Sequence, residues 1–455
     1  MLPAPSENRG LSFEDDFSKL LVWRRRTPKF TTFRVNSLTT NPVHFLEILK
    51  QSLAKLAEDR SQAGTISAIP PVWQHPKFPE AVAFGCWDRS EDLPRHDSEV
   101  IVDRACGAAV LRGAHVFVPG VIGLLPGARE GDIVSIYADI CGVSKRGWTQ
   151  KLNEKSRMFV GNGVLLMDRK QIFCENGFSR GIAVLVTDNE SGCPSLPENL
   201  FEPGMAIMQN LPSIVCGRVV DPQPGEIILD MCAAPGNKTT HLSALMNNEG
   251  AIIALDRSAS RISKLRQVCL EMSVRNVAAF VFDSVKAVKI EQASGSDDDC
   301  NHSSLERGPP FSPCLFDRIL LDAPCSGLGQ RPKLEEIDMK HVASFPPLQK
   351  KLFKTAVSLL KPGGILVYST CTVTVEENEG VVRWALDHFS SLTLLPAEPR
   401  FFNSALNKSA SSNILSSTEL SCIQKFVPSV DTDEENNHCE RDTIGFFIAR
   451  FQKQT

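Results

Sequence analysis

The stretch that decides the fold is residues 227–240, which read IILDMCAAPGNKTT. The apolar run Ile227–Leu229 leads into a turn of small residues around Gly236, and a helix is predicted to begin near Lys238. A buried strand, a glycine turn and a helix form the first unit of an α/β sheet. Small residues let a ligand approach the backbone, and the start of a helix offers unpaired N–H groups. The segment therefore predicts a ligand-binding turn at the carboxyl end of a strand.

The same alternation of strands and helices continues to the end of the chain. Apolar runs at 251–256 and 279–283, and the runs before Asp322 and before Cys371, are predicted strands. Helices are predicted around 258–272, 347–361 and 376–388, and a last strand over 445–451. Repeated strand–helix units imply an α/β fold with a doubly wound, mostly parallel sheet. Residues 291–314 and 429–443 are low in complexity and are expected to be solvated loops, to which no function is assigned.

A second domain precedes this sheet. Between residues 99 and 190, short β-rich runs alternate with glycine turns, at 100–102, 114–118, 132–137 and 181–186. This spacing is typical of a small β-barrel or sandwich. We therefore expect an N-terminal region over 1–98, a small β-domain over 99–190 and the α/β domain over 191–455.

The N-terminal region contains a basic run. Residues 19–34 carry six Lys or Arg and no acidic residue, with Trp23, Phe30 and Phe33 among them. Aromatic rings that stack on bases, beside cations that bind phosphates, suit an RNA surface. The alternative is a solvated helix end with a few core aromatics, and locally we favour that alternative.

Bulk composition limits the classes of function. The chain has 455 residues, 42% of them hydrophobic, and a net charge of −4, so nucleic-acid binding would need local basic patches. No apolar run reaches the ~18 residues of a membrane span, and the first residues lack the pattern of a signal peptide. Fourteen cysteines without CxxC spacing predict reduced thiols and no metal site. We expect a cytoplasmic protein with no membrane partner.

Two of these cysteines follow predicted strands. Cys325 lies in the segment LLDAPCSG at 320–327, which also contains Asp322, and Cys371 lies in ILVYSTCT at 365–372. Because ligands bind beyond the carboxyl ends of parallel strands, the two thiols and the carboxylate are predicted to meet at one site. A thiolate is a strong nucleophile for an electron-poor ring carbon. The alternative is a pair of buried structural cysteines at the edge of the sheet.

Acidic residues close the neighbouring strands. Asp256 lies 20 residues beyond Gly236, where a carboxylate suits the ribose hydroxyls of a nucleoside cofactor. Asp283 closes the next strand and is suited to bind an adenine amino group. A helix cap is the alternative for either residue alone. Lys238-Thr239 resembles a phosphate-binding P-loop, but Asn237 stands where that motif requires the glycine directly before the lysine.

Taken together, three motifs resemble one family. DxCAAPGxKT at 230–239, DAPCSG at 322–327 and STCT at 369–372 are similar to the Sun-domain RNA (cytosine-5) methyltransferases, over roughly residues 203–451. Residues 102–120 resemble a PUA domain, a small RNA-binding barrel, and Phe33–Asn36 resemble the family's N-terminal segment. An inserted PUA domain indicates the subfamily that methylates a cytosine in the tRNA acceptor stem. The resemblance implies a Rossmann-like class I methyltransferase fold.

The resemblance also implies a cofactor and its site. The cofactor is S-adenosylmethionine, and the residues implied to hold it are Cys232, Ala233, Ala234, Pro235, Gly236, Asn237, Lys238, Asp256, Asp283 and Asp322. Two departures from the family pattern occur. Asn237 replaces a glycine, a change we expect to be tolerated because asparagine accepts left-handed geometry. Residues 330–334 lack a tryptophan-containing stretch.

The catalytic residues implied are Cys371, Cys325, Asp322 and Lys238. Cys371 would add to carbon 6 of cytosine, and a protonated Asp322 of raised pKa would stabilise charge at ring nitrogen 3. Cys325 would assist loss of the proton from carbon 5, and Lys238 would favour the Cys371 thiolate. The expected partners are the acceptor stem and 3′ end of tRNA, with other RNA as a further substrate, and the protein is expected to be a monomer.

Three other functions stay open at this point. The chain could be a catalytically silent RNA-binding or assembly protein on a methyltransferase scaffold, although both thiols, Lys238 and the acidic residues argue against it. An ATPase is disfavoured by the broken P-loop. A methyltransferase acting on DNA or on a small molecule is disfavoured by the RNA-type barrel.

Overall fold

A computed structural model describes residues 13–62, 68–88, 92–173, 180–197, 199–289, 307–401, 413–427 and 442–455. Most of the two predicted loops, residues 291–306 and 429–441, lies outside these ranges. The chain divides into two compact units. The insert unit comprises the described parts of Met1–Pro28, Glu91–Ser195 and Arg331–Glu336, and the sheet unit comprises those of Lys29–Ser90, Leu196–Gln330 and Ile337–Thr455. The predicted N-terminal region over 1–98 is thus shared between the two units.

The sheet unit is built on one large sheet with the strand order β13-β12-β11-β14-β15-β18-β16, in which β17 also pairs with β18. The strands are β11 (Ile227–Asp230), β12 (Ala251–Asp256), β13 (Val277–Val281), β14 (Phe316–Asp322), β15 (Leu360–Thr370), β16 (Leu392–Leu395), β17 (Gln424–Phe426) and β18 (Phe446–Lys453). The first five strands in the sheet order are mutually parallel, which confirms the predicted doubly wound core. The C-terminal edge differs, because β18 runs antiparallel to β15, β16 and β17.

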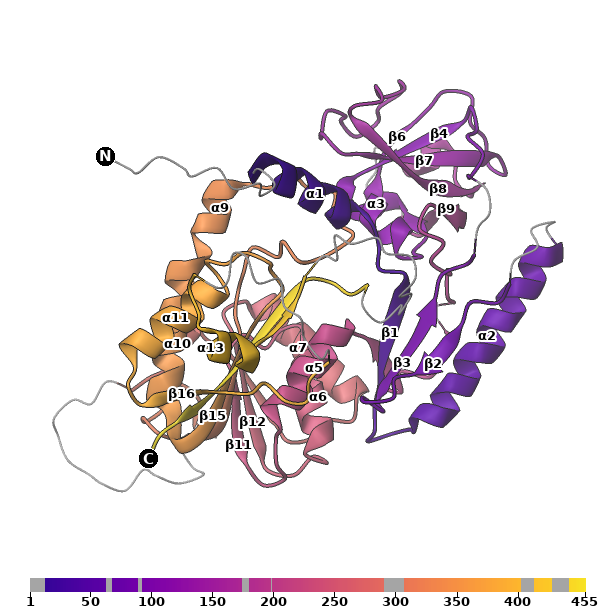
Figure 1. Ribbon diagram of the computed structural model, residues 1–455. Coiled ribbons are helices and arrows are strands. Elements are labelled where there is room, and N and C mark those ends of the chain that lie inside the picture. The colour runs from indigo at the N-terminus through magenta and orange to yellow at the C-terminus, as the bar shows by residue number, and fades with distance from the viewer. Residues whose placement is uncertain are drawn as a thin grey trace, which may run out of the picture. The chain divides into compact units, whose positions relative to one another are not determined.

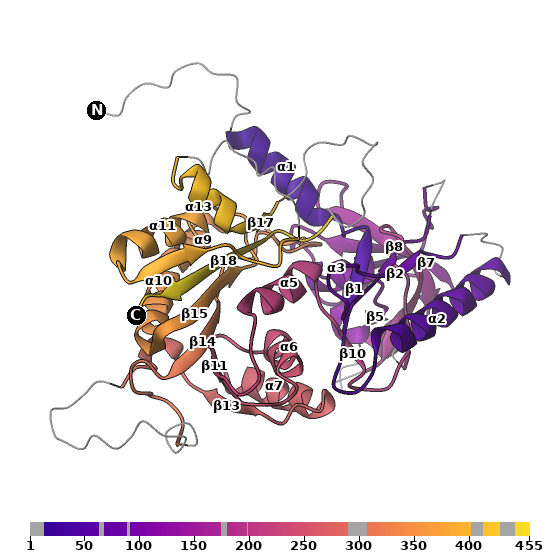
Figure 2. The same ribbon diagram turned by 60° about the horizontal axis from the view of Figure 1, so that its bottom comes forward.

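Helices cover both faces of this sheet. Successive strand residues point to opposite faces, so Leu229 and Leu321 pack with the core under α10 (Phe345–Leu359) and α11 (Glu379–His388). Their neighbours Ile228 and Leu320 pack with α5 (Leu211–Val220) and α6 (Asn237–Leu245) on the other face. Figure 2 shows α10 on one side of the sheet and α5 and α6 on the other. Further helical elements are α7 (Ala259–Glu271), α9 (Met339–Ala343), α13 (Ser417–Cys422) and the short η2 (Ser284–Lys286).

Connectivity creates a switch point in the middle of the sheet. From β11 the chain proceeds to β12 and β13 on one side, and then returns to β14 and β15 on the other side. In sheets of this type the crevice for a ligand opens beyond the carboxyl ends of the strands where the order reverses. Here that place is the ends of β11 and β14.

A small second sheet in the sheet unit includes the last part of the basic run. Its order is β10-β1-β3-β2, with β1 (Phe30–Val35), β2 (Val72–Gln74), β3 (Ala81–Gly85) and β10 (Ala206–Met208), accompanied by α2 (Pro42–Gln62). Phe30 and Phe33 are core residues, and Arg34 is completely buried. These three residues therefore cannot form an RNA surface, and the alternative of core aromatics is the correct one for them.

The insert unit contains a six-stranded sheet of order β5-β9-β8-β7-β4-β6, drawn in purple in Figure 1. Its strands are β4 (Glu99–Val102), β5 (Val116–Phe117), β6 (Val121–Leu124), β7 (Ile133–Asp139), β8 (Arg157–Leu165) and β9 (Ile182–Asn189). Its helical elements are α1 (Phe13–Arg25), α3 (Arg104–Leu111), α4 (Arg169–Ile172) and η1 (Val118–Gly120). Buried valines and isoleucines from most strands and from α3 form a single core. Among the helices in the described part of the chain, none is long and apolar enough to cross a membrane.

Candidate active site

The two cysteine motifs meet at one site, as predicted, beyond the carboxyl ends of the neighbouring strands β14 and β15. Asp322, the last residue of β14, lies opposite Ser369 of β15, so the loops that follow the two strands start side by side. Sγ of Cys325 lies 3.4 Å from Sγ of Cys371. The two cysteines lie 46 positions apart in the sequence and therefore share one site. The alternative of two unrelated structural cysteines does not fit this contact.

The surroundings make the two thiols unequal. A hydrogen bond from Cys325 lowers the pKa of Cys371 against the opposing effect of burial, and the charge of Lys238 and a hydrogen bond from Gln330 act in the same direction. The hydrogen bond to Cys371, together with burial, raises the pKa of Cys325 well above its ordinary value. Of the two thiols, Cys371 is thus the more readily ionised, and ionisation is what makes a thiol nucleophilic.

An ion pair lies beside the thiols. Nζ of Lys238, at the start of α6, donates to Oδ2 of Asp322 at 2.7 Å. Burial, the largest single influence, would lower the pKa of Lys238, but the charge and hydrogen bond of Asp322 together with the nearby thiols raise it. Ser369 donates a hydrogen bond of 2.8 Å to the other oxygen of Asp322. Both oxygens of Asp322 therefore accept hydrogen bonds, and the protonated Asp322 that the resemblance implies stays a prediction.

The turn at residues 232–238 is compact and lined with small side chains. The N–H of Gly236 donates to the carbonyl of Ala233 at 2.9 Å, and Ala233 and Ala234 are buried. Gly236 has φ 111°, and a Cβ atom there would lie 3.2 Å from the Leu265 side chain. Asn237 is the first residue of α6 and is helical, so its tolerance of left-handed geometry, which we invoked from the sequence, is not needed.

The two carboxylates that are predicted to bind the nucleoside part of the cofactor lie at or just beyond the ends of adjacent strands. Asp256 ends β12 and is almost fully buried; it accepts a hydrogen bond from the N–H of Ser258 and pairs with Arg261 at 2.9 Å. Arg261 also donates to the carbonyl of Ala234, so it spans the edge of the turn. Asp283 follows β13 and accepts from the N–H of Val285. Asp283 is thus the N-cap of η2, whereas Asp256 holds the backbone of Ser258, which is itself the N-cap of α7. Each carboxylate keeps further acceptor capacity.

A third carboxylate, Asp230, has a structural role beneath the turn. It is buried at the end of β11, and Thr239 donates to its Oδ2 at 2.8 Å. Burial is the main cause that raises its pKa to about 7. Through Thr239, Asp230 fixes the first turn of α6, the helix that carries Lys238.

Sequence reasoning missed the residue that joins the two cysteine loops. The Glu377 side chain is fully buried and accepts four hydrogen bonds. Two come from the N–H and the hydroxyl of Ser326, one from Thr374, and one from Gln349, which also donates to the carbonyl of Pro324. We call Glu377, Gln349 and Ser326 the Glu377 clamp. An acidic residue shortly after the STCT motif was the only signal in the sequence, and nothing there identified its partners.

Arg34 supports the turn from the small sheet. Its guanidinium donates to Thr240 at 2.7 Å and to the carbonyl of Asn237 at 3.3 Å, while Nε donates to Gln209. The basic run in the sequence suggested a surface cation, but the structure places Arg34 inside the protein against the first turn of α6. Within the described ranges, no three His, Cys, Asp or Glu side chains gather to hold a metal ion.

Comparisons with known proteins identify the family of this chain. A profile of the family described as "16S rRNA methyltransferase RsmB/F" matches residues 218–452. The tRNA (cytosine(72)-C(5))-methyltransferase NSUN6 of Mus musculus is 42% identical over 97% of this chain and 90% of its own length. The tRNA (cytosine(72)-C(5))-methyltransferase of Pyrococcus horikoshii is 35% identical over 83% and 84%.

A solved structure extends the similarity to three dimensions. The crystal structure of NSun6 from Pyrococcus horikoshii with SFG has a TM-score of 0.69 and 29% identity, and the match covers 97% of this chain and 96% of that one. The profile match spans Lys238, Cys325 and Cys371. The chain belongs to the RsmB/F family of methyltransferases.

Proposed function

We propose that this protein is an S-adenosylmethionine-dependent tRNA (cytosine-5) methyltransferase with Cys371 as its nucleophile. The observation that carries the proposal is the Cys325–Cys371 contact beside the Lys238–Asp322 pair at the switch point of the sheet. A nucleophilic thiol, a second thiol and an ion pair are the groups that addition to a pyrimidine ring and subsequent elimination require.

The turn at residues 232–238 fits the cofactor. Ala233, Ala234 and Gly236 leave the backbone accessible, and the start of α6 provides N–H groups at the carboxyl end of β11. Asp256 and Asp283 would accept hydrogen bonds from the ribose and the adenine. The exposed Arg261 can leave Asp256 without disturbing the core. S-adenosylmethionine supplies an electrophilic methyl group on sulfur.

The protein side chains have separate tasks in the reaction. The Cys371 thiolate adds to carbon 6 of cytosine, which makes carbon 5 nucleophilic. Lys238 and Asp322 lie beside the thiols, and the Lys238 ammonium would stabilise negative charge that develops on the ring. Once carbon 5 carries the methyl group, Cys325 assists loss of the remaining proton there, and the Cys371 thiolate leaves. A target base inside a duplex must first be flipped out, which costs a few kcal/mol by general estimate.

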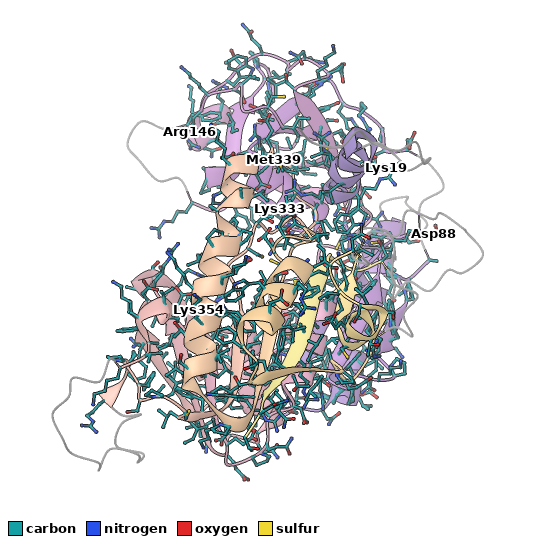
Figure 3. All side chains as sticks on the ribbon, turned by 60° about the vertical axis from the view of Figure 1, so that its left-hand side comes forward. Lys19, Asp88, Arg146, Lys333, Met339 and Lys354 are labelled. Atoms are coloured by element: carbon teal, nitrogen blue, oxygen red, sulfur yellow. The ribbon has the colours of Figure 1, made fainter. Side chains whose placement is uncertain are left out.

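RNA contacts would come from both units. The β-sheet of the insert unit is proposed to be a PUA domain that binds the 3′ end of tRNA. In the sheet unit, α9 and α10 form a stretch without an acidic residue, on which Lys340, Lys351 and Lys354 are exposed. Figure 3 locates Met339 on α9 and Lys354 on α10. Exposed cations on helices that contain no acidic residue suit the phosphates of an acceptor stem.

The experiment is methyl transfer from labelled S-adenosylmethionine to tRNA transcripts with cytosine or uridine at position 72, beside a DNA duplex of the same stem sequence. We expect label in 5-methylcytosine only with the cytosine transcript. Equal labelling of the DNA would contradict an RNA substrate. Equal labelling of the uridine transcript would place the target base elsewhere.

A further inference from the structure

Gln330 contacts the reacting sulfur and has no role in the mechanism above. It belongs to the segment after the DAPCSG motif that departs from the family pattern. Its Nε2 lies 3.2 Å from Sγ of Cys371, within hydrogen-bond distance for a sulfur acceptor. An amide N–H that donates to sulfur stabilises the thiolate more than the thiol, because the acceptor then carries a full charge.

The backbone holds Gln330 in this position. The N–H of Gln330 donates to the carbonyl of Gly327, which has φ 66°, and the N–H of Gly329 donates to the carbonyl of Cys371 itself. Gly329 also pairs with Gly445, and a Cβ atom at Gly329 would lie 2.2 Å from the Gly445 carbonyl oxygen. Hydrogen bonds thus hold the turn between Cys371 and the start of β18. The Gln330 amide is therefore already directed at the Cys371 sulfur.

We propose that Gln330 is a catalytic hydrogen-bond donor that stabilises the Cys371 thiolate before attack and again when the thiolate leaves the methylated ring. The proposal rests on Cys371 as the nucleophile. It explains why the two neighbouring thiols differ in role, since Gln330 donates to Cys371 and not to Cys325. It also assigns a function to the first residue of the segment that lacks the family's tryptophan.

The size of the effect follows from thiol chemistry. Loss of one hydrogen bond to a charged group corresponds to roughly one unit in the pKa of Cys371. A thiolate of higher pKa is intrinsically more nucleophilic, by about threefold for one unit at a Brønsted slope of about 0.5. Removal of the donor should therefore slow the reaction of Cys371 near neutral pH by about threefold, and should speed it by about threefold at high pH.

The experiment measures the alkylation rate of Cys371 by iodoacetamide as a function of pH, with each cysteine-containing peptide quantified separately by mass spectrometry. Gln330→Met removes the donor at similar length, and Gln330→Glu places a negative charge there. We expect the titration midpoint of Cys371 to rise in the order wild type, Gln330→Met, Gln330→Glu. The exposed Gln267→Met is the matched control and should keep the wild-type midpoint. Thermal unfolding confirms that each variant is folded.

Two results would overturn the proposal. One is a wild-type midpoint in both Gln330 variants, and the other is a Gln330→Glu midpoint no higher than that of Gln330→Met. Alkylation needs neither RNA nor cofactor, so it also separates this proposal from the proposed function. If the Cys371 midpoints follow the expected order but the protein does not methylate tRNA, the role of Gln330 toward the thiolate is supported and the proposed function is refuted.

Discussion

At the scale of single residues, the site combines two pairs whose members depend on each other. Cys325 and Cys371 lie 3.4 Å apart, and the hydrogen bond between them acidifies Cys371 at the expense of Cys325. Lys238 and Asp322 form the second pair, and Lys238 also favours the Cys371 thiolate. The charge state of Cys371 thus depends on Cys325 in the loop after β14, on Asp322 of β14 and on Lys238 of α6.

The Lys238–Asp322 pair is expected to behave as a coupled unit. Lys238→Met leaves the partly buried Asp322 without its cation, and Asp322→Asn leaves Lys238 buried and unpaired. Each single change should lower the free energy of unfolding by about 1–3 kcal/mol. The double variant should lose less than the sum of the two.

Urea denaturation at pH 7 measures this coupling, with the exposed Lys264→Met as the control for loss of a surface charge. If the losses in free energy of unfolding of the two single variants simply add up in the double variant, the ion pair does not stabilise the folded protein. In that case Lys238 would act on Cys371 alone.

At the scale of elements, buried polar groups fix the loops and helices that carry the site. The Glu377 clamp joins the loop after β14 to the loop after β15. On the other face of the sheet, Glu80, which directly precedes β3, accepts from Arg218 of α5 at 2.7 Å and contacts His241 of α6 at 3.0 Å. The carboxylates of both networks are buried, so loss of a donor leaves an oxygen of Glu377 or Glu80 without a partner and away from water.

Glu377→Gln tests the clamp. The substitution keeps the shape of the side chain but replaces one of the two oxygens to which four donors bind. The new amide N–H points at those donors, so their hydrogen bonds to this atom are lost. We expect the free energy of unfolding to fall by about 2–3 kcal/mol and methyl transfer to fall strongly, while S-adenosylmethionine binding stays close to wild type. Glu376→Gln, at the exposed neighbouring glutamate, is the matched control. Unchanged methyl transfer in Glu377→Gln would show that the clamp does not position the thiols.

His241 makes stability depend on pH. Burial lowers its pKa to about 4 from an ordinary value of 6.5. As pH falls from 7, the unfolded chain takes up a proton at this residue while the folded protein does not, so stability is lost between about pH 7 and 4. The loss from pH 7 to pH 5 should be about 2 kcal/mol.

His241→Gln keeps an N–H donor for Glu80 and removes the titration. Urea midpoints at pH 7 and pH 5 should therefore differ less in the variant than in the wild type. An equal difference in the two proteins would assign the acid sensitivity to other groups.

At the scale of the whole molecule, sequence reasoning succeeded where one strong pattern decides the structure. Buried parallel strands are continuous apolar runs, so 227–229, 251–256 and the runs before Asp322 and Cys371 were identified correctly. Strand β8 was missed because its sequence, RMFVGNGVL, contains two glycines. Helix α3 was missed because its eight residues are too few to show a helical period. The partners of Arg34 and Glu377 come from distant segments, and only tertiary packing brings them together.

RNA binding is expected to use both units. Lys145 of the insert unit and Lys351 of the sheet unit are exposed cations. Replacement of either by alanine should weaken tRNA binding and reduce the slope of log affinity against log salt concentration by about 1. Binding of S-adenosylmethionine should not change. Filter binding across a salt series measures the slopes, and a wild-type slope in Lys145→Ala would argue against a phosphate contact at that residue.

The order of the two cysteines is tested most directly by trapping the covalent complex between the protein and its RNA. With tRNA and S-adenosylmethionine, Cys325→Ala should accumulate an adduct that survives denaturing electrophoresis, because Cys371 still attacks but product release is impaired. Cys371→Ala should form no adduct and transfer no methyl group. An adduct with Cys371→Ala, or its absence with Cys325→Ala, would contradict the assignment of Cys371 as the nucleophile.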